Sequence, residues 1–242
     1  MKTIGLLGGV TWHSTVEYYR LINAGVQAQL GGSHSAKCIL HSVEFAEVER
    51  LQHEGGWDAL SGFVIDVARR IEQGGADFLV ICANTIHRAA EAVEAATSIP
   101  LLHIADATAG EIRKQGLRKV GLLGTRFTME QDFYRCRLEQ RHHLEVLIPG
   151  EEERNRVHDV IYNELGRGIV ADASREAYKS IIQNLQTRGA EGVILGCTEI
   201  PLLIRQGDCS LPVFDTTAIH AAAAVEWALG DENRGNARTA LS

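Results

Sequence analysis

The sequence has no run of basic residues and no excess of positive charge. Asp and Glu number 31 against 24 Lys and Arg, which gives a net charge of −7. A chain without a basic stretch cannot neutralise a phosphate backbone along its length, so we expect no nucleic-acid partner. The chain also lacks an apolar run of about 18 residues, which a transmembrane helix requires. We therefore expect no membrane partner.

Cysteine pairs are missing as well. The five cysteines are widely scattered, with no C-x-x-C pair and no Cys/His cluster at zinc-binding spacing. We expect reduced thiols and no metal site, which leaves a catalytic cysteine available. The first ten residues are broken by three glycines and show no cleavage site of small residues, so we expect no signal peptide and a cytoplasmic protein.

What the chain does have is the composition of an ordinary folded protein. Hydrophobic residues make up 45% and charged residues 23% of its 242 residues, so it can bury a core without disulfides or metals. At about 150 residues per domain, this length fits one large domain or two small ones. Short apolar runs bounded by Gly alternate with longer amphipathic stretches, which is typical of βαβ units around a parallel sheet. The sequence predicts an α/β fold.

The alternation can be assigned residue by residue. Eight strands are expected at residues 3–7, 37–42, 78–82, 101–103, 119–123, 144–147, 192–195 and 213–214. The clearest helices are expected at residues 14–30, 57–73, 128–140, 151–165, 174–188 and 218–229. The polar residues 231–242 are expected to form a loosely held tail.

A weak internal repeat divides the chain. Three segments recur in the same order: residues 4–8 as 120–124, residues 75–77 as 189–191, and residues 99–102 as 211–214. Three ordered matches favour duplication over chance. We expect two pseudosymmetric lobes, each a parallel sheet flanked by helices. The first lobe is expected to comprise residues 1–97 and 212–242, and the second residues 98–211.

Two segments of the repeat end in chemically active loops. Residues 78–87 and 192–201 each run from an apolar strand into a polar loop that carries a thiol. Ligands of parallel sheets bind beyond the carboxyl ends of the strands, so we expect these loops to face one another across a cleft between the lobes. A helix N-terminus favours the thiolate, which can take a proton. A buried thiol that acts only as a small apolar side chain is the alternative, and for Cys197 we favour the catalytic role.

The two loops contain specific motifs. Residues 82–85 read Cys-Ala-Asn-Thr, and residues 195–201 read Leu-Gly-Cys-Thr-Glu-Ile-Pro. With further matches at residues 8–15, 41–45 and 212–216, nearly the whole chain except its tail resembles the aspartate/glutamate racemase family, and in particular its bacterial L-aspartate/glutamate-specific branch. That family inverts an amino-acid α-carbon without pyridoxal phosphate. The resemblance implies a small acidic amino acid as substrate, no cofactor, and a homodimer.

The resemblance also implies a set of site residues. Cys197 and Cys82 are the candidate acid/base groups, and the substrate-binding positions are Val10, Thr11, Gln52, Ala83, Asn84, Thr85, Thr198 and Glu199. Asn84, Thr85 and Thr198 would hold the α-carboxylate, although helix capping is an alternative for the first two. Glu199 would orient Thr198 or bind the substrate ammonium. Arg50 and Arg167 are added on charge alone, with surface charge as the alternative for each.

One position departs from the family pattern. Most two-cysteine racemases place the first base immediately before the Asn-Thr pair, where this chain has Ala83. The repeat pairs Ala83 with Cys197 and Cys82 with Gly196. Because side chains alternate along a strand, a cleft-facing residue 83 would turn Cys82 into the lobe. A bend after Ile81 would instead present the Cys82 thiol.

Three outcomes follow from this departure. Cys82 could serve as the second base, or water and the Thr85 hydroxyl could reprotonate poorly, or Ala83 could be an engineered replacement that traps substrate. Our leading hypothesis is a cofactor-independent racemisation of L-aspartate, extending to L-glutamate, with a bias from L to D. The rivals are a single-cysteine decarboxylase or isomerase of a small dicarboxylate, and a degenerate racemase that only binds acidic amino acids.

Overall fold

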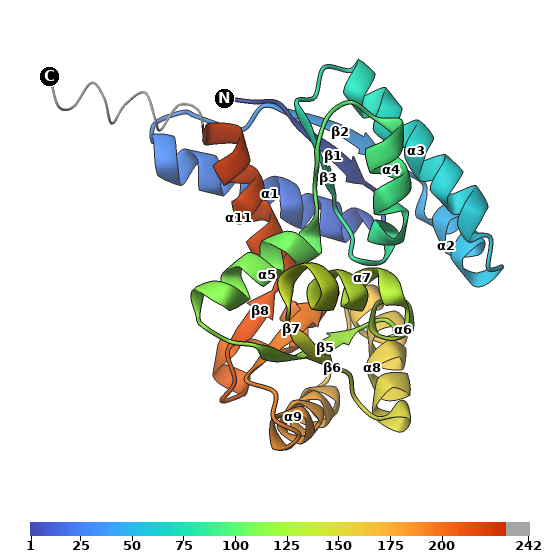
Figure 1. Cartoon of the computed structure of the whole chain (residues 1–242), viewed down its shortest axis with the longest axis vertical. Helices are drawn as coiled ribbons and strands as arrows, with labels where there is room; N and C mark the ends of the chain where they lie inside the picture. Colours follow the sequence, from blue (N-terminus) through green and yellow to red (C-terminus); the bar gives the residue numbers. More distant parts are fainter. Residues whose placement is uncertain (231–242) are drawn as a thin grey trace, which may run out of the picture. The chain divides into compact units, whose positions relative to one another are not determined.

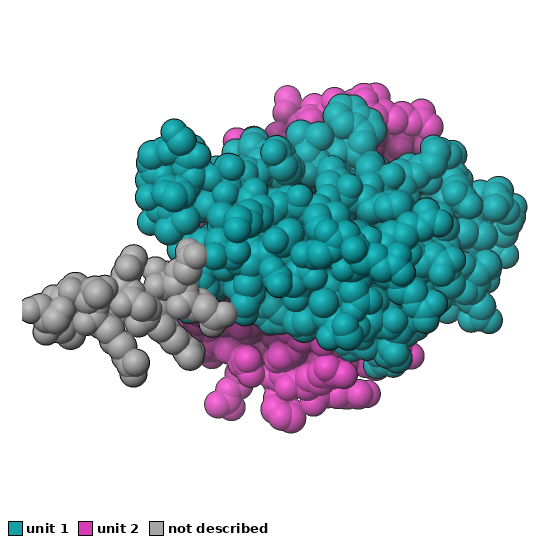
Figure 2. Space-filling model, turned by 90° about the horizontal axis from the view of Figure 1, so that it is seen from above, with its two compact units in different colours: residues 1–103, 220–242 teal, residues 104–219 magenta. Residues whose placement is uncertain are grey.

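The computed structural model describes residues 1–230, except for the side chain of residue 53. Its chain divides into two compact units (Figure 1). Unit 1 comprises Met1–His103 and His220–Ser242, and unit 2 comprises Ile104–Ile219; Figure 2 gives each unit its own colour. The predicted tail, residues 231–242, lies outside the described residues.

Unit 1 is built on a four-stranded parallel sheet with the strand order β2-β1-β3-β4. Its elements are β1 (Ile4–Gly8), α1 (Trp12–Leu30), β2 (Cys38–Ser42), α2 (Phe45–His53), α3 (Trp57–Gln73), β3 (Phe78–Ile81), the 3₁₀ helix η1 (Thr85–Ala89), α4 (Ala90–Ala96), β4 (Leu101–Leu102) and most of α11 (Thr216–Leu229). The strands β1 and β3 are buried throughout. Burial on both faces explains why they read as continuous apolar runs in the sequence.

The two faces of this sheet carry two separate cores. On one face, α2, α3 and α4 pack against Leu7, Leu79 and Ile81. On the other, α1 and α11 pack against Leu6 and Val80. Helix α3 shows why the sequence forms such a layer, because its buried side chains recur at helical spacing and form one apolar stripe: Leu60, Val64, Val67, Ala68 and Ile71.

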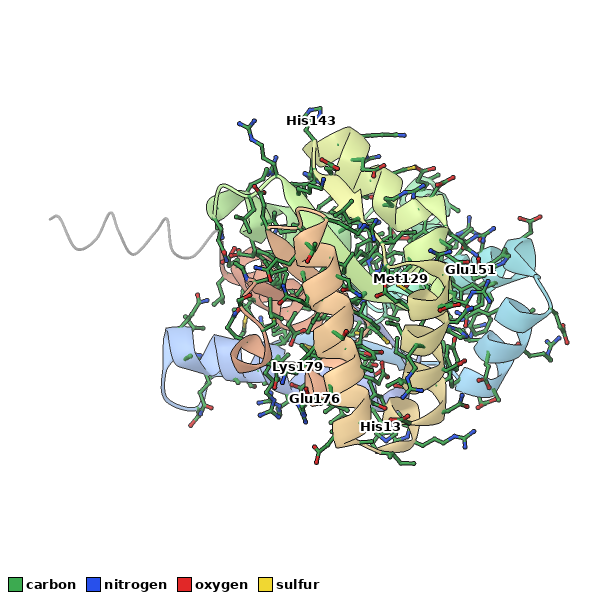
Figure 3. The ribbon with its side chains drawn as sticks, turned by 90° about the horizontal axis from the view of Figure 1, so that it is seen from below. His13, Met129, His143, Glu151, Glu176 and Lys179 are labelled. Carbon is green, nitrogen blue, oxygen red and sulfur yellow. The ribbon has the colours of Figure 1, made fainter. Side chains whose placement is uncertain are left out.

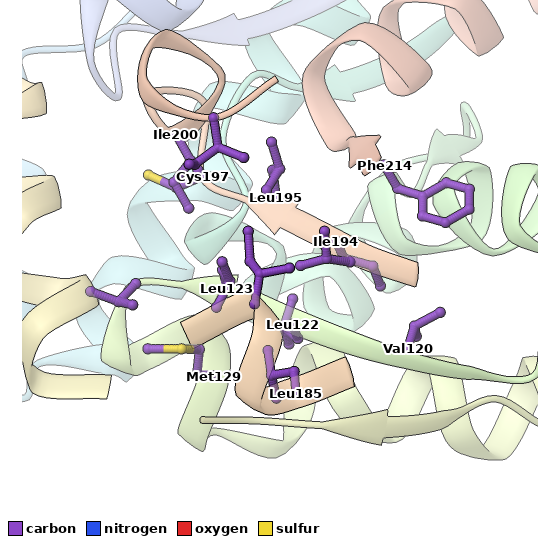
Figure 4. Packing of buried hydrophobic residues seen from close by; sticks show 14 of the residues in the cluster. Val120, Leu122, Leu123, Met129, Leu185, Ile194, Leu195, Cys197, Ile200 and Phe214 are labelled. Carbon is purple, nitrogen blue, oxygen red and sulfur yellow. The ribbon is translucent and has the colours of Figure 1, made fainter. Parts of the chain in front are cut away.

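Unit 2 repeats this design with the strand order β6-β5-β7-β8, again parallel throughout. Its elements are α5 (Ile104–Lys114), β5 (Lys119–Gly124), α6 (Arg126–Glu130), α7 (Asp132–Cys136), the π-helix η2 (Arg137–Arg141), β6 (Glu145–Leu147), α8 (Glu151–Asn163), η3 (Leu165–Arg167), α9 (Asp172–Thr187), β7 (Gly192–Gly196), α10 (Ile200–Leu203), η4 (Gln206–Asp208) and β8 (Val213–Asp215). One core gathers side chains of β5, β7 and the surrounding helices, and Figure 4 shows part of it around Leu122 and Ile194.

The sheet registers reproduce the sequence repeat. Ile4 pairs with Phe78 in unit 1, and their repeat partners Val120 and Gly192 pair in unit 2. The fourth strands follow the same rule, because Leu79 pairs with Leu101 just as Val193 pairs with Val213. The structure therefore confirms the predicted α/β fold with two similar parallel sheets.

The unit boundaries fall later in the chain than the sequence predicts. Residues 98–103 were expected in the second lobe, but β4 pairs with β3 of unit 1. Residues 212–219 were expected in the first lobe, but β8 pairs with β7 of unit 2. The physical reason is that each repeat needs its own fourth strand to cover the edge of its third.

Most predicted helices are present, and one is interrupted. The helix expected at residues 128–140 is divided into α6, α7 and η2, because Gln131 adopts an extended backbone. Helix α9 matches its prediction within two residues and carries an exposed pair in which Lys179 Nζ lies 2.9 Å from Glu176 Oε1 (Figure 3). Within residues 1–230, no helix is both long enough and apolar enough to span a membrane.

Candidate active site

In unit 2, the carboxyl ends of β5 and β7 lie side by side. Gly124 pairs with Gly196, so the residues that follow, Thr125 and Cys197, begin neighbouring loops. Gly196 has no room for a side chain, because a Cβ atom there would lie 2.9 Å from Leu123 O. The glycine therefore allows the two strand ends to approach closely and sets where the thiol begins.

Cys197 lies at the margin of the unit 2 core. Its exposed fraction is 8%, and its sulfur points away from Leu195 and Ile194 (Figure 4). The thiol donates a hydrogen bond to Glu199, with 2.9 Å between Sγ and Oε2. The Thr198 hydroxyl donates to the same carboxylate oxygen at 2.7 Å. The structure thus brings together three of the predicted residues around one carboxylate.

The electrostatics of Cys197 differ from the sequence-based expectation. Burial, followed by the negative charge of Glu199, raises the pKa of the Cys197 thiol well above its ordinary value. Backbone N–H groups of Thr198 and Glu199 act in the expected direction and lower the pKa of the Cys197 thiol, but burial and the Glu199 carboxylate outweigh them. In the free protein the thiol keeps its proton, and a proton acceptor already contacts it.

Thr125 is a residue that the sequence analysis missed. It caps α6, and its Oγ1 accepts from the backbone N–H of Thr128, just as Thr11 caps α1 and accepts from Ser14. Thr125 is buried and follows the strand beside Cys197. The repeat could have indicated Thr125, because Gly124 corresponds to Gly8. Thr11 follows Gly8 after two additional residues, so the two threonines do not align without a gap.

In unit 1, Cys82 and Ala83 occupy opposite faces of the sheet. Cys82 is fully buried in the core formed with α1 and α11, whereas Ala83 belongs to the core formed with α2, α3 and α4. Burial raises the pKa of the Cys82 thiol far above its usual range. No bend after Ile81 brings this thiol to the face of Ala83, which is the arrangement that side-chain alternation predicts.

The loop after Ala83 is ordered by its own polar residues. Asn84 is buried and Thr85 is half-buried. Asn84 takes helical backbone angles and makes no side-chain capping hydrogen bond to η1, so capping does not account for its amide. The Ala83 carbonyl accepts a hydrogen bond from Nδ1 of His87 at 2.8 Å.

The first loop of unit 1 brings Val10 and Thr11 to the carboxyl end of β1. Gly9 has a φ of +91°, a conformation that favours glycine, and its N–H donates to Thr15 Oγ1 at 2.7 Å. Both Val10 and Thr11 are half-buried. The loop is held rigidly against α1, and Thr11 uses its hydroxyl as the cap of that helix.

Gln52 lies on α2 with an exposed fraction of 5%. A side-chain amide carries N–H donors that can reach an oxygen of a bound ligand, so a buried position on α2 is compatible with a binding role.

The two arginines that were added on charge are surface residues. Arg50 pairs with Glu54 at 2.8 Å, and both side chains are more than half exposed. Arg167 lies exposed on η3. Neither shows the buried, pre-oriented geometry of a carboxylate clamp. In the described part of the chain, no cluster of three or more His, Cys, Asp and Glu side chains is arranged to hold a metal ion.

The fold and these residues define a class of protein, namely two-lobed α/β proteins with a thiol at the carboxyl end of a repeated strand. The model of the Asp/Glu/hydantoin racemase family matches residues 7–224, and the chain belongs to this family. It is therefore an isomerase of the racemase type.

Individual relatives agree with this assignment. A provisionally assigned Asp/Glu racemase from Yersinia pestis is 52% identical, with a TM-score of 0.91 over 95% of this chain and 100% of that one. An aspartate racemase homologue from Pyrococcus horikoshii is 38% identical, with a TM-score of 0.82 over 94% and 99% of the two chains. The broad specificity amino-acid racemase RacX of Bacillus subtilis is 26% identical, over 69% of this chain and 72% of its own.

Proposed function

We propose that the protein racemises acidic amino acids without a cofactor, acting on L-aspartate and also on L-glutamate, with a bias from L to D. The observation that carries the proposal is the hydrogen bond from the Cys197 thiol to Glu199. It joins a proton-transferring group to a proton acceptor at the carboxyl end of a parallel strand, where ligands of such sheets bind. The similarity to the aspartate racemase homologue of Pyrococcus horikoshii supports the choice of substrate.

The first half of the reaction uses the Cys197–Glu199 pair. Glu199 accepts the thiol proton, and the resulting thiolate removes the α-proton of the L-enantiomer. The Cα–H bond breaks, its electron pair stays on the substrate, and the charge spreads into the α-carboxylate. The substrate ammonium group lowers the cost of the thiolate when it binds beside the sulfur, because opposite charges attract strongly in a poorly solvated site.

The second half of the reaction must deliver a proton to the opposite face of Cα. Ala83, the repeat partner of Cys197, has only a methyl group, and the Cys82 thiol is turned into the core. We therefore assign no catalytic role to Cys82. Water or the Thr85 hydroxyl supplies this proton, and both are weaker acids than a thiol. Delivery from this side is slow, so the L-enantiomer exchanges its α-proton through Cys197 faster than it is inverted.

Recognition of the substrate is divided between its two carboxylates. Asn84, Thr85 and Thr198 hold the α-carboxylate, where donors stabilise the charge that develops during proton removal. Val10, Thr11 and Gln52 hold the distal carboxylate. The burial of Gln52 on α2 supports this role, because its amide can donate to a carboxylate oxygen there.

The absence of a thiol at position 83 favours one alternative, a single-cysteine decarboxylase or isomerase of a small dicarboxylate. Such reactions need a proton on only one face of the reacting carbon. They would leave the Cα–H of L-aspartate unexchanged, whereas the racemase removes it in every forward event.

The test is deuterium uptake at Cα in heavy water. L-aspartate and L-glutamate are incubated with the full chain, and deuterium is followed by NMR beside the formation of the D-enantiomer. We expect uptake with at least one of the two amino acids. Turnover of maleate or a malonate, with no uptake into either amino acid, would replace the racemase by the alternative.

We also propose that the protein works as a cytoplasmic homodimer. Helix α1 supports self-association, because Trp12, Val16 and Tyr19 lie on one face of it and are 62%, 55% and 53% exposed. Light scattering on the wild type and on Tyr19→Glu measures the mass directly. A dimeric wild type and a monomeric variant are expected, and a monomeric wild type contradicts the proposal.

A further inference from the structure

Three histidines in unit 1 are buried and take no part in the proposed reaction. His87 and His103 are each 2% exposed, and His220 is fully buried. They come from η1, from the residue after β4 and from α11. The ring of His87 lies 4.5 Å from that of His103 and 5.7 Å from that of His220, measured between centroids. The ring of His87 therefore contacts both of the others.

The proton positions on His220 follow from its partners. Its Nε2 lies 2.8 Å from Leu102 O, and a carbonyl oxygen can only accept, so Nε2 carries a proton. Its Nδ1 then accepts from the Tyr18 hydroxyl at 2.8 Å. Burial lowers the pKa of His220 to about 4, which keeps the ring neutral. Both ring nitrogens of His220 are therefore hydrogen-bonded, and the His87 ring packs against this ring.

His87 acts on the backbone of the loop. Its Nδ1 lies 2.8 Å from Ala83 O, so by the same reasoning Nδ1–H donates to this carbonyl. The peptide bond between Ala83 and Asn84 is planar, so fixing the carbonyl also fixes the direction of the Asn84 N–H. The hydrogen bond spans only four residues, from η1 back to the end of β3. It determines how the Asn84–Thr85 segment leaves the strand.

We propose that His87 is a positioning residue for substrate binding. Its hydrogen bond to Ala83 O holds the Ala83–Asn84 peptide so that Asn84 and Thr85 present their donors to the α-carboxylate. The inference rests on the proposed function, which assigns those two residues to the carboxylate. A displacement of about 1 Å in such donors weakens binding and turnover severely.

Comparison with the second repeat shows that this hydrogen bond from a histidine side chain belongs to unit 1. The position equivalent to His87 is Pro201, which cannot donate a side-chain hydrogen bond. In unit 2 the loop is ordered instead by Glu199, which accepts from the side chains of Cys197 and Thr198. At the position equivalent to Glu199, unit 1 has Thr85. In that loop His87 donates to Ala83 O.

The test compares His87→Leu with His87→Asn. Leucine removes the donor, whereas the asparagine Nδ2 can donate from nearly the position of Nδ1. Binding of L-aspartate is measured by calorimetry, and kcat and KM of Cα–H exchange are measured separately. We expect Leu to raise the Kd and KM about tenfold or more with a smaller change in kcat, and Asn to stay within about threefold of wild type. The Asn84 amide resonance should move in Leu and return in Asn.

Several results decide the matter. Equal weakening of binding in the Leu and Asn variants would show a merely structural role and overturn the inference, as would an unchanged Kd in His87→Leu. If His87→Leu does not fold, His87→Gln displaces the donor by one bond and is expected to show the weakened binding instead. A wild type that binds L-aspartate without exchange contradicts the proposed function alone. A wild type that binds no acidic amino acid contradicts both.

Discussion

The ends of β3 and β7 have the same backbone arrangement and different chemistry. Both strands pair with the first strand of their repeat in the same register. After β7 comes a thiol bonded to a carboxylate. After β3 comes Cys82, whose thiol lies on the other face of the sheet, and then Ala83, the repeat partner of Cys197, which has only a methyl group. The two repeats therefore share their backbone geometry while only unit 2 carries a thiol at this position.

This contrast explains why the direction of the proposed racemisation depends on the residues at the two strand ends and not on the fold that the two units share. Two equivalent thiols would give a reaction with equal access to both faces of Cα. One thiol gives efficient proton removal from one face and slow delivery to the other. The proposed bias from L to D follows from a single position, residue 83.

The largest effect is expected from removal of the thiol after β7. Cys197→Ser should lower the rate of Cα–H exchange from L-aspartate by about 10³-fold, because a hydroxyl is a far poorer acid/base group than a thiol. Exchange is followed by NMR in heavy water. Near-normal exchange in this variant would refute the role of Cys197.

The matched control is removal of the thiol after β3. Cys82→Ala should leave exchange within about threefold of wild type and lower the free energy of unfolding by about 1 kcal/mol, the cost of a small cavity. Urea denaturation measures the second quantity. A loss of exchange comparable to that of Cys197→Ser would instead make Cys82 the second base.

The next effect concerns the carboxylate that only unit 2 has. Glu199→Gln removes a negative charge beside Cys197, so the pKa of the thiol should fall. It also removes the proton acceptor, so exchange should slow by about 10²-fold. Alkylation of Cys197 as a function of pH reports the first change, and NMR the second. Faster exchange together with a lower pKa would mean that Glu199 only keeps the thiol protonated.

Restoring the symmetry of the two strand ends should give a smaller gain. Ala83→Cys places a thiol at the repeat partner of Cys197, and D-to-L turnover should rise by about tenfold. Ala83→Ser is the control, since its hydroxyl is a weaker acid and should give less. Polarimetry from pure D-aspartate measures both. Turnover unchanged by the thiol would show that residue 83 does not face the reacting carbon.

The smallest effect concerns acid stability, in which the two units differ. The lowered pKa of His220 means that only the unfolded chain takes up this proton between pH 6.5 and about 4, so unit 1 loses stability as the pH falls through that range. In unit 2, burial would raise the pKa of Asp106, but hydrogen bonds from Arg137 and His142 outweigh it and lower the pKa. That contribution is lost only below the ordinary value of 3.8.

Pulse-labelling hydrogen exchange tests this difference. Amides of unit 1 should lose protection before those of unit 2 as the pH falls from 7 to 4.5. His220→Gln should remove the difference and should cost about 1–2 kcal/mol at neutral pH, because the Tyr18 hydroxyl loses its acceptor. Earlier loss of protection in unit 2 would contradict the assignment.

Much of the fold could be predicted because the repeat and the strand periodicity report burial. All eight predicted strands are found among residues 1–230. The clearest of them, β1, β3 and β7, are buried throughout and therefore appear as short apolar runs in the sequence. The boundaries were misplaced because β4 and β8 are too short to show which sheet they join. The break at Gln131 had no glycine or proline to signal it.

The placement of the candidate residues could be predicted in part, their electrostatics could not, and their catalytic and binding roles stay predictions. Motifs and the repeat located Cys197, Thr198 and Glu199, and strand alternation predicted that Cys82 and Ala83 would face opposite ways. The sequence did not show that Glu199 turns back to accept from Cys197, because that contact depends on the turn between β7 and the short α10. The hydrogen bond from His87 to Ala83 O was hidden for the same reason.

The central claim, a competent thiol at Cys197 and only a methyl group at its repeat partner Ala83, is tested most directly by the early products from L-aspartate in heavy water. The account predicts that deuterium enters the recovered L-aspartate faster than D-aspartate forms, because Cys197 returns deuterium to its own face more readily than a weak acid supplies the other. D-aspartate that forms as fast as it does in Ala83→Cys, with unlabelled L-aspartate remaining, would contradict it.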